Sequence, residues 1–223
     1  MQPFVALRAA ASRARVLRVG REVEGESAQA KGADGAVRAK RWLERTSRAE
    51  VPWVNPNRGS AQKLRGTWPH GGQSFSFDLL GYLLYDDLDK ESFFAEVKNY
   101  SSYSDLNDLY DEYLAKCYVM LDQQPGFADH FMWISWHPHQ VTNWSQLCSP
   151  GWVRRAVLTH RGRVLGPAIS KEDAEVLVDD SRCAQVAARL WLIILSEKQE
   201  NLVLSDRHLG LIRSQVATSG GSA

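Results

Sequence analysis

The chain has 223 residues, of which 44% are hydrophobic, so it is long enough to bury the core of one domain, with or without a small appendage. We find no apolar run of roughly 18 residues, so we expect neither a membrane-spanning helix nor a secretory signal. The three cysteines, Cys117, Cys148 and Cys183, lie far apart, which argues against a disulfide framework or a thiolate zinc site and predicts a cytoplasmic protein.

Charge is unevenly distributed along the chain. Residues 1–48 contain 11 Lys and Arg against 5 Asp and Glu, whereas residues 49–223 contain 16 against 21, although the formal net charge is only +1. A polyanionic partner would be attracted to the first part, because neutralised phosphates release counterions. The alternative is an Arg-rich helix face that is simply solvated.

The N-terminal part combines a basic segment with a predicted helix. Residues 1–33 are rich in Ala, Arg, Ser and Glu and predict a basic helix or a flexible arm. Asp34 is a suitable N-cap for a helix that ends near Arg48, with one apolar face. The other face carries Arg38, Lys40, Arg41 and Arg45. Residues 51–72 hold three prolines and four glycines and predict an irregular connection.

The middle of the chain predicts a hairpin, a helix and a strand. Runs of β-branched and aromatic residues over 74–85 and 92–100 predict two strands joined by the polar turn 86–90. Apolar residues at helical spacing then predict a helix that Ser104 caps and that ends at residues 123–126. The apolar run 131–136 predicts a third strand.

The C-terminal part is expected to continue with a strand over 153–159, a buried helix over 181–197, a short strand over 202–204 and a final helix from Asp206. We therefore predict an α/β fold with a central mixed β-sheet flanked by helices. One domain would cover residues 34–216, followed by a disordered tail over 217–223.

The predicted hairpin brings two acidic residues together. If its turn is centred near Asp87, Asp78 lies opposite Glu96, and strand alternation places Lys98 on the same side. Phe77, Leu79, Ala95 and Val97 would then face the other side. Two carboxylates with Cβ atoms about 5 Å apart repel each other. A divalent cation relieves that repulsion, and Mg²⁺ prefers such oxygen ligands.

The segments Phe77-Asp78-Leu79 and Phe94-Ala95-Glu96-Val97-Lys98 resemble the signature of the PD-(D/E)xK nuclease superfamily, in which an Asp and a Glu-x-Lys lie on a hairpin before an amphipathic helix. The resemblance covers residues 34–136 and implies a restriction-endonuclease-like core. It implies that Asp78 and Glu96 hold Mg²⁺, for which Mn²⁺ would substitute, with the Val97 carbonyl as an extra ligand. Lys98 would position or activate the attacking water and stabilise the developing negative charge.

The sequence departs from this family at three points. Phe77 stands where many members have Pro. Many members also have a Glu in the first helix, just after a Gly, whereas Gly35 is followed by Ala36; Glu44 is the remaining candidate, two turns later. Members often carry a Gln or Lys on the helix after the hairpin, and Lys116 would fill that role.

Other residues have alternative interpretations. His137 and His139 have spacing that suits a metal, but no third ligand with suitable local spacing supports a zinc site. Trp133, Trp136, Trp144 and Trp152 would stack on unpaired bases or, as is more common, fill the core. Glu96 and Lys98 themselves would, in the simplest alternative, belong to a solvated strand face.

The sequence thus predicts a Mg²⁺-dependent nuclease, with DNA favoured over RNA as the substrate and an endonuclease favoured over an exonuclease. Roles in restriction, phage defence or repair fit equally, and a homodimer or a partner protein is left open. Arg38, Arg41 and Arg45 would bind the nucleic-acid backbone. The alternative is a non-catalytic nucleic-acid-binding or assembly subunit that keeps the nuclease fold, which the absent first-helix Glu favours.

Overall fold

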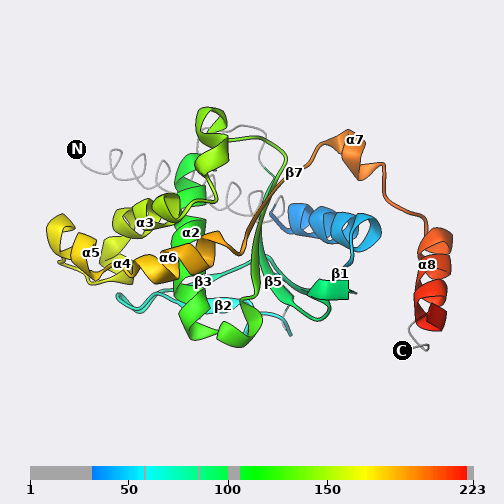
Figure 1. Ribbon diagram of the computed structural model, residues 1–223, viewed down its shortest axis with the longest axis horizontal. Coiled ribbons are helices and arrows are strands. Elements are labelled where there is room, and N and C mark those ends of the chain that lie inside the picture. The colour runs from blue at the N-terminus through cyan, green and yellow to red at the C-terminus, as the bar shows by residue number, and fades with distance from the viewer. Residues whose placement is uncertain (1–31, 58, 85, 100–105, 220–223) are drawn as a thin grey trace, which may run out of the picture.

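A five-stranded sheet lies at the centre of the protein, and helices cover both of its faces (Figure 1). The computed structural model describes residues 32–57, 59–84, 86–99 and 106–219. The fold is α/β with a mixed sheet, as the sequence predicted. Of the predicted N-terminal arm only residues 32 and 33 are described, and both belong to the first helix. None of the described helices is long and apolar enough to cross a bilayer.

The elements follow one another in an order close to the predicted one. A first helix is described over residues 32–46. It is followed by β1 (Ala49–Val54), β2 (Arg65–Thr67), β3 (Ser74–Ser76), β4 (Leu79–Leu83), η1 (Asp86–Leu88), β5 (Ser92–Lys98), α2 (Leu106–Gln123), η2 (Pro125–Phe127), β6 (His130–Ser135), η3 (Val141–Gln146), α3 (Pro150–Thr159), α4 (Arg161–Val164), α5 (Lys171–Leu177), α6 (Asp180–Ala187), β7 (Leu190–Ile194), α7 (Glu197–Glu200) and α8 (Asp206–Ser219).

The central sheet is antiparallel on one side and parallel on the other. Its strand order is β1-β4-β5-β6-β7. The pairs β1–β4 and β4–β5 are antiparallel, whereas β5–β6 and β6–β7 are parallel. The parallel pair β5–β6 requires a crossover connection, which α2 provides. As a result the three parallel strands all end at the same edge of the sheet.

The register of the β4–β5 hairpin is the predicted one. Leu79 pairs with Ala95 and Tyr82 with Ser92, so the same alignment brings Asp78 opposite Glu96. The predicted single strand over 74–85 is wrong, however, because the chain bends at Phe77 and Asp78. Residues before the bend form β3, which pairs with β2 in a separate two-stranded sheet. Asp78 therefore lies in the bend immediately before β4.

Two hydrophobic clusters lie on opposite faces of the sheet. On one face the helix over 32–46 packs against Leu79, Ala95 and Val97. On the other face α2, α3 and α6 pack against Phe94 and its neighbours. Phe77 belongs to this second cluster, so its predicted placement with Leu79 is wrong. The bend at residues 77–78 breaks the alternation on which that prediction rested.

The predicted irregular connection over 51–72 contains part of β1 and all of β2. Pro52 is compatible with β1 because this strand is at the edge of the sheet, where a missing amide donor is tolerated. The register shift between Glu50 and Trp53 blurs the alternation of its side chains, which explains why the strand was not predicted.

The C-terminal predictions need three corrections. Residues 153–159 belong to α3 rather than to a strand, because Ser149 caps the helix through the Trp152 amide and Pro150 starts it. The predicted helix over 181–197 divides into α6, β7 and the start of α7. Its uniformly apolar stretch is the half-buried edge strand β7, paired with β6, and periodicity alone does not separate a short apolar strand from a buried helix.

Beyond β7 the predicted strand over 202–204 does not form, since these residues lie in a turn and an irregular segment. The final helix, α8, does begin at Asp206 as predicted. It includes residues 217–219, so the predicted disordered tail is wrong for these three; residues 220–223 lie outside the described chain.

Candidate active site

Glu96 and Lys98 project from β5 toward α2. Alternation along the strand places both on the face that Phe94 also occupies. Glu96 is only 4% exposed. Its Oε1 accepts a hydrogen bond from Lys98 Nζ at 2.7 Å and another from Lys116 Nζ of α2 at 3.3 Å. The carboxylate is thus held between two ammonium groups, and the alternative of a solvated strand face is wrong for Glu96.

Asp78 extends the β4–β5 ladder with its side chain. Its amide donates to the Ala95 carbonyl at 3.0 Å, and its Oδ2 accepts from the Val97 amide at 2.8 Å. The N–H and C=O groups of one strand residue point to the same side. The Val97 carbonyl therefore points in the same direction as its amide, toward Asp78.

The electrostatics of the site differ between its two carboxyl groups. Burial, followed by repulsion from Glu96, raises the pKa of Asp78 to about 7, against the attraction of Lys98, the Val97 amide and Lys116. Burial also acts to raise the pKa of Glu96, but the ammonium groups of Lys98 and Lys116 outweigh it and hold that pKa below its ordinary value. Near neutral pH, Glu96 is the anion and Asp78 is poised between its two forms.

The residues fit a hard divalent cation. Glu96 Oε2 is buried and has no hydrogen-bond partner among the described residues. A buried carboxylate oxygen without a donor is costly, and a cation relieves that cost. Asp78, Glu96 and the Val97 carbonyl provide the oxygen ligands that Mg²⁺ prefers. Within the described chain no cluster of three or more Asp, Glu, His or Cys residues forms, so protein carboxylates would supply only part of the coordination.

The structure thus brings together four of the predicted site residues, whereas Glu44 lies elsewhere. The four are Asp78, Glu96, Lys98 and Lys116. Glu44 Oε1 accepts from the Val51 amide at 3.1 Å and lies 3.1 Å from Lys40 Nζ. The helix that carries Glu44 covers the face of the sheet opposite to Glu96. Glu44 therefore does not replace the missing first-helix glutamate.

The three arginines that we predicted to bind nucleic acid have different environments. Arg38 forms a bidentate pair with Glu200, and Arg45 contacts Asp206 Oδ1 at 2.6 Å and the Leu204 carbonyl at 3.2 Å. Arg41 is exposed. Protein carboxylates therefore occupy two of the three guanidinium groups, which leaves Arg41 as the arginine presented to solvent.

The aromatic and histidine candidates are mainly core residues. Trp133 and Trp152 are buried, and Trp144 is 40% exposed. His139 is 3% exposed and packs against Tyr110 and Trp133, and burial lowers its pKa to about 4. A neutral imidazole inside an aromatic cluster is a core residue, which agrees with the absence of sequence support for a zinc site at His137 and His139.

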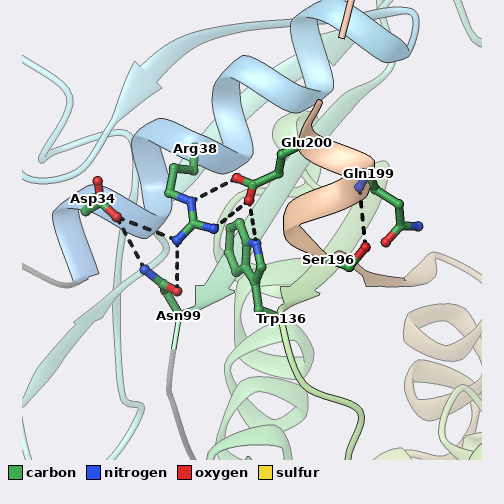
Figure 2. Close-up of polar contacts among 7 residues, drawn as sticks. All are labelled: Asp34, Arg38, Asn99, Trp136, Ser196, Gln199 and Glu200. Carbon is green, nitrogen blue, oxygen red and sulfur yellow. Dashed lines mark hydrogen bonds and ion pairs between the residues drawn. The ribbon is translucent and has the colours of Figure 1, made fainter. Parts of the chain in front are cut away.

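Glu200 was not identified from the sequence, although it contacts both Arg38 and Trp136 beside the site (Figure 2). It lies about a hundred residues from Lys98 along the chain, and no motif connects the two. The one available signal was β7. Recognising residues 190–194 as a further parallel strand would have placed the residues that follow it, including Glu200, at the edge of the sheet where β5 ends.

Comparisons with known proteins give no match for this chain among family models, curated proteins or solved structures.

Proposed function

We propose that the protein is a Mg²⁺-dependent nuclease that hydrolyses phosphodiester bonds, with DNA favoured over RNA as the substrate, on a restriction-endonuclease-like core. The observation that carries this proposal is the buried Oε2 of Glu96, which has no partner in the described chain. It lies beside a second buried carboxyl group and two lysines. Such an arrangement suits a cation and an anionic substrate together.

The order of elements supports the proposed core. From residue 32 to residue 135 the chain forms a helix, the three antiparallel strands β1, β4 and β5 of the central sheet, the helix α2 and the parallel strand β6, with the separate β2–β3 pair inserted between β1 and β4. Asp78 immediately precedes the middle antiparallel strand, β4, and Glu96 and Lys98 lie on the next one, β5. This arrangement agrees with the helix, hairpin, helix and strand that the PD-(D/E)xK resemblance implies.

Each residue then has a distinct role. Asp78, Glu96 and the Val97 carbonyl would hold Mg²⁺, or Mn²⁺ in its place, and the bound ion would lower the pKa of a ligand water and screen the phosphate charge. Lys98 positions the attacking water and donates to the phosphate oxygens as negative charge develops. Lys116 holds Oε1 of Glu96, which leaves Oε2 for the ion. Hydrolysis transfers the hydroxyl of water to phosphorus and its proton to the leaving oxygen.

A cleavage assay tests this proposal. Plasmid DNA, DNA oligonucleotides and RNA are incubated with the protein and Mg²⁺ or EDTA, and wild type is compared with Glu96→Ala and Lys98→Ala. We expect metal-dependent cutting by wild type alone. Glu197→Ala and Lys171→Ala serve as matched controls, because both side chains are exposed and lie in other elements. Cutting that survives both site substitutions would contradict the assignment of these residues.

A second function is a non-catalytic nucleic-acid-binding or assembly subunit. The observation that favours it is the absence of a third acidic residue from the cluster within the described chain. Under this alternative the protein binds DNA without cutting it under any metal condition, and Glu96→Ala leaves the affinity unchanged. A gel-shift assay run beside the cleavage assay separates the two functions.

A further inference from the structure

The ends of β5, β6 and β7 bring distant residues together. Because the three strands are parallel, the residues that follow them meet at one edge of the sheet. The Leu195 amide donates to the Ser135 carbonyl at 2.9 Å, which keeps the chain after β7 beside the end of β6. Ser196 then caps α7 by accepting from the Gln199 amide at 3.3 Å. This turn carries Glu200 over the strand ends.

Glu200 accepts hydrogen bonds from Arg38 in the first helix and from Trp136 just after β6, as Figure 2 shows. Arg38 donates through Nε to Oε1 at 2.8 Å and through Nη2 to Oε2 at 2.5 Å, and Trp136 Nε1 donates to Oε2 at 3.2 Å. The Arg38 guanidinium also lies 4.5 Å from the centroid of a Trp136 ring. Both oxygens of Glu200 have charged or ring donors, and its side chain is only 17% exposed.

The same network contacts the chain at Lys98 and at the residue that follows it. Arg38 Nη1 donates to Asn99 Oδ1 at 3.3 Å, and Asn99 Nδ2 donates to Asp34 Oδ2 at 3.4 Å. The Trp136 amide donates to the Lys98 carbonyl at 3.4 Å. Alternation sends the Lys98 side chain toward α2, and the side chains of its two neighbours toward the helix over 32–46.

A glycine allows the helix to lie this close. A Cβ atom on Gly35 would come within 2.8 Å of Asn99 Cβ and 3.5 Å of Val97 Cγ1. The first of these distances is shorter than real contacts allow. The backbone of residues 97–99 is thus fixed from the helix face, while Lys98 projects from the opposite face into the candidate site.

We propose that Arg38 and Glu200 are positioning residues that brace the end of β5 and thereby fix the Lys98 ammonium beside Glu96. This inference rests on the proposed nuclease function and assigns Arg38 a role other than phosphate binding. The bidentate geometry suits a carboxylate fork, which Lys in place of Arg would not reproduce. Neither residue contacts the substrate.

The test compares Glu200→Gln with Glu197→Gln. Both variants remove one carboxylate from α7, but Glu197 is exposed. In Glu200→Gln we expect kcat on Mg²⁺-dependent DNA cleavage to fall by about 10-fold or more, because a small displacement of a catalytic group is costly. KM and the Mg²⁺ half-saturation should change by less than about twofold, since Asp78 and Glu96 stay in place. Glu197→Gln should behave as wild type.

Hydrogen exchange provides a readout that does not depend on activity. Amide exchange over residues 96–99 should be faster by about 10-fold in Glu200→Gln, and unchanged in Glu197→Gln, because the brace limits local opening. Arg38→Lys should reproduce the effect, and the double variant with Glu200→Gln should lose little more than either single variant.

A second pair of variants probes the same brace from the other side. Gly35→Ala and Gly32→Ala both raise helix propensity, but no atom of the described residues lies within 4 Å of a Cβ atom on Gly32. Only Gly35→Ala should push the helix from Asn99 and lower kcat. If Gly35→Ala and Gly32→Ala had the same kcat, the proposed brace would be wrong. This test remains available even if Glu200→Gln proved too unstable to purify.

The outcomes separate the two proposals. If wild type cuts no nucleic acid, the nuclease function fails, and exchange over residues 96–99 alone decides the brace. If wild type cuts and Glu200→Gln keeps its kcat per folded molecule, the brace is wrong and the nuclease function stands. A fall in thermal stability without a change in kcat or in local exchange also overturns it.

Discussion

Glu96 and Glu200 are both paired with cations, yet their surroundings differ. Glu96 accepts from Lys98 and Lys116 through one oxygen only, and its Oε2 has no partner among the described residues. Glu200 accepts from Arg38 through both oxygens and from Trp136 as well. Attraction to the neighbouring cations lowers the pKa of both carboxyl groups, although burial opposes this in each case. At Glu96 burial is the largest single effect, but the two lysines together outweigh it.

The difference separates a structural ion pair from a candidate binding site. A fully bonded carboxylate such as Glu200 gains nothing from a further ligand, whereas the buried oxygen of Glu96 stays unsatisfied until one arrives. Sites built for a ligand commonly reduce stability in the ligand's absence. We therefore expect substitutions at Glu96 to affect activity and metal binding, and substitutions at Glu200 to affect positioning.

The largest expected effect is on turnover. Glu96→Gln keeps the shape of the side chain but removes the charge that would hold the ion, so Mg²⁺-dependent cleavage should fall by about 10³-fold. Glu200→Gln should lose only about 10-fold, because its effect is transmitted through the backbone. Steady-state cleavage rates at saturating Mg²⁺ measure both. Equal losses in the two variants would remove the distinction between them.

Metal-dependent stability should follow the same division. Ca²⁺ or Mg²⁺ at 100 times its Kd should stabilise wild type by about 2.7 kcal/mol, because the ion binds only the folded protein. Glu96→Gln should lose this gain and Glu200→Gln should keep it. Thermal unfolding with metal and with EDTA provides the measurement; a gain that persists in Glu96→Gln would place the ion elsewhere.

Asp78 gives a pH-dependent prediction. Its pKa is raised from 3.8 to about 7, so the folded protein binds this proton more tightly than the unfolded chain does. The stabilisation is complete below pH 3.8 and is lost as the pH rises through about 7. As the pH rises from mildly acidic to mildly alkaline, the free energy of unfolding of Asp78→Asn should therefore increase by about 2 kcal/mol relative to that of metal-free wild type.

Urea unfolding in EDTA at the two pH values measures that gain. Asp129, whose Oδ2 accepts from the Ser92 amide and hydroxyl at the other end of β5, provides a control position for Asn substitution. A constant difference between Asp78→Asn and wild type across this pH range would show that Asp78 is ionised throughout.

The smallest expected effect is at Lys116. Lys116→Met removes one of the two donors to Glu96 Oε1, while Lys98 at 2.7 Å remains. We expect a loss of about 10-fold or less in kcat, because the carboxylate keeps its closer partner. Lys98→Met should be more harmful in the same assay, and the reverse order would exchange the roles of the two lysines.

The sequence was most informative where local geometry determines the outcome. The hairpin register follows from one turn, so the placement of Asp78 opposite Glu96 was predictable from strand alternation. Lys116 was identified through the family resemblance and lies on the helix that the crossover requires. The bend that moves Phe77 to the other face was not predictable, because nothing local distinguishes one long strand from two short ones.

The sequence was least informative where distant segments meet. Leu190–Ile194 is apolar throughout, and only its neighbour β6 makes it a strand rather than a helix. Because β7 was missed, the position of Glu200 over the strand ends was missed as well. Arg38 was consequently interpreted as a phosphate ligand, since its carboxylate partner lies 162 residues away in the chain.

The most direct measurement of the central claim is a crystal structure of the wild-type protein soaked in Mn²⁺, with anomalous differences used to locate the ion. We predict a peak within coordination distance of an Asp78 carboxylate oxygen and Glu96 Oε2, about 2.0–2.4 Å from each. A saturated crystal without such a peak, or one in which Glu96 Oε2 accepts a protein hydrogen bond instead, would contradict the account.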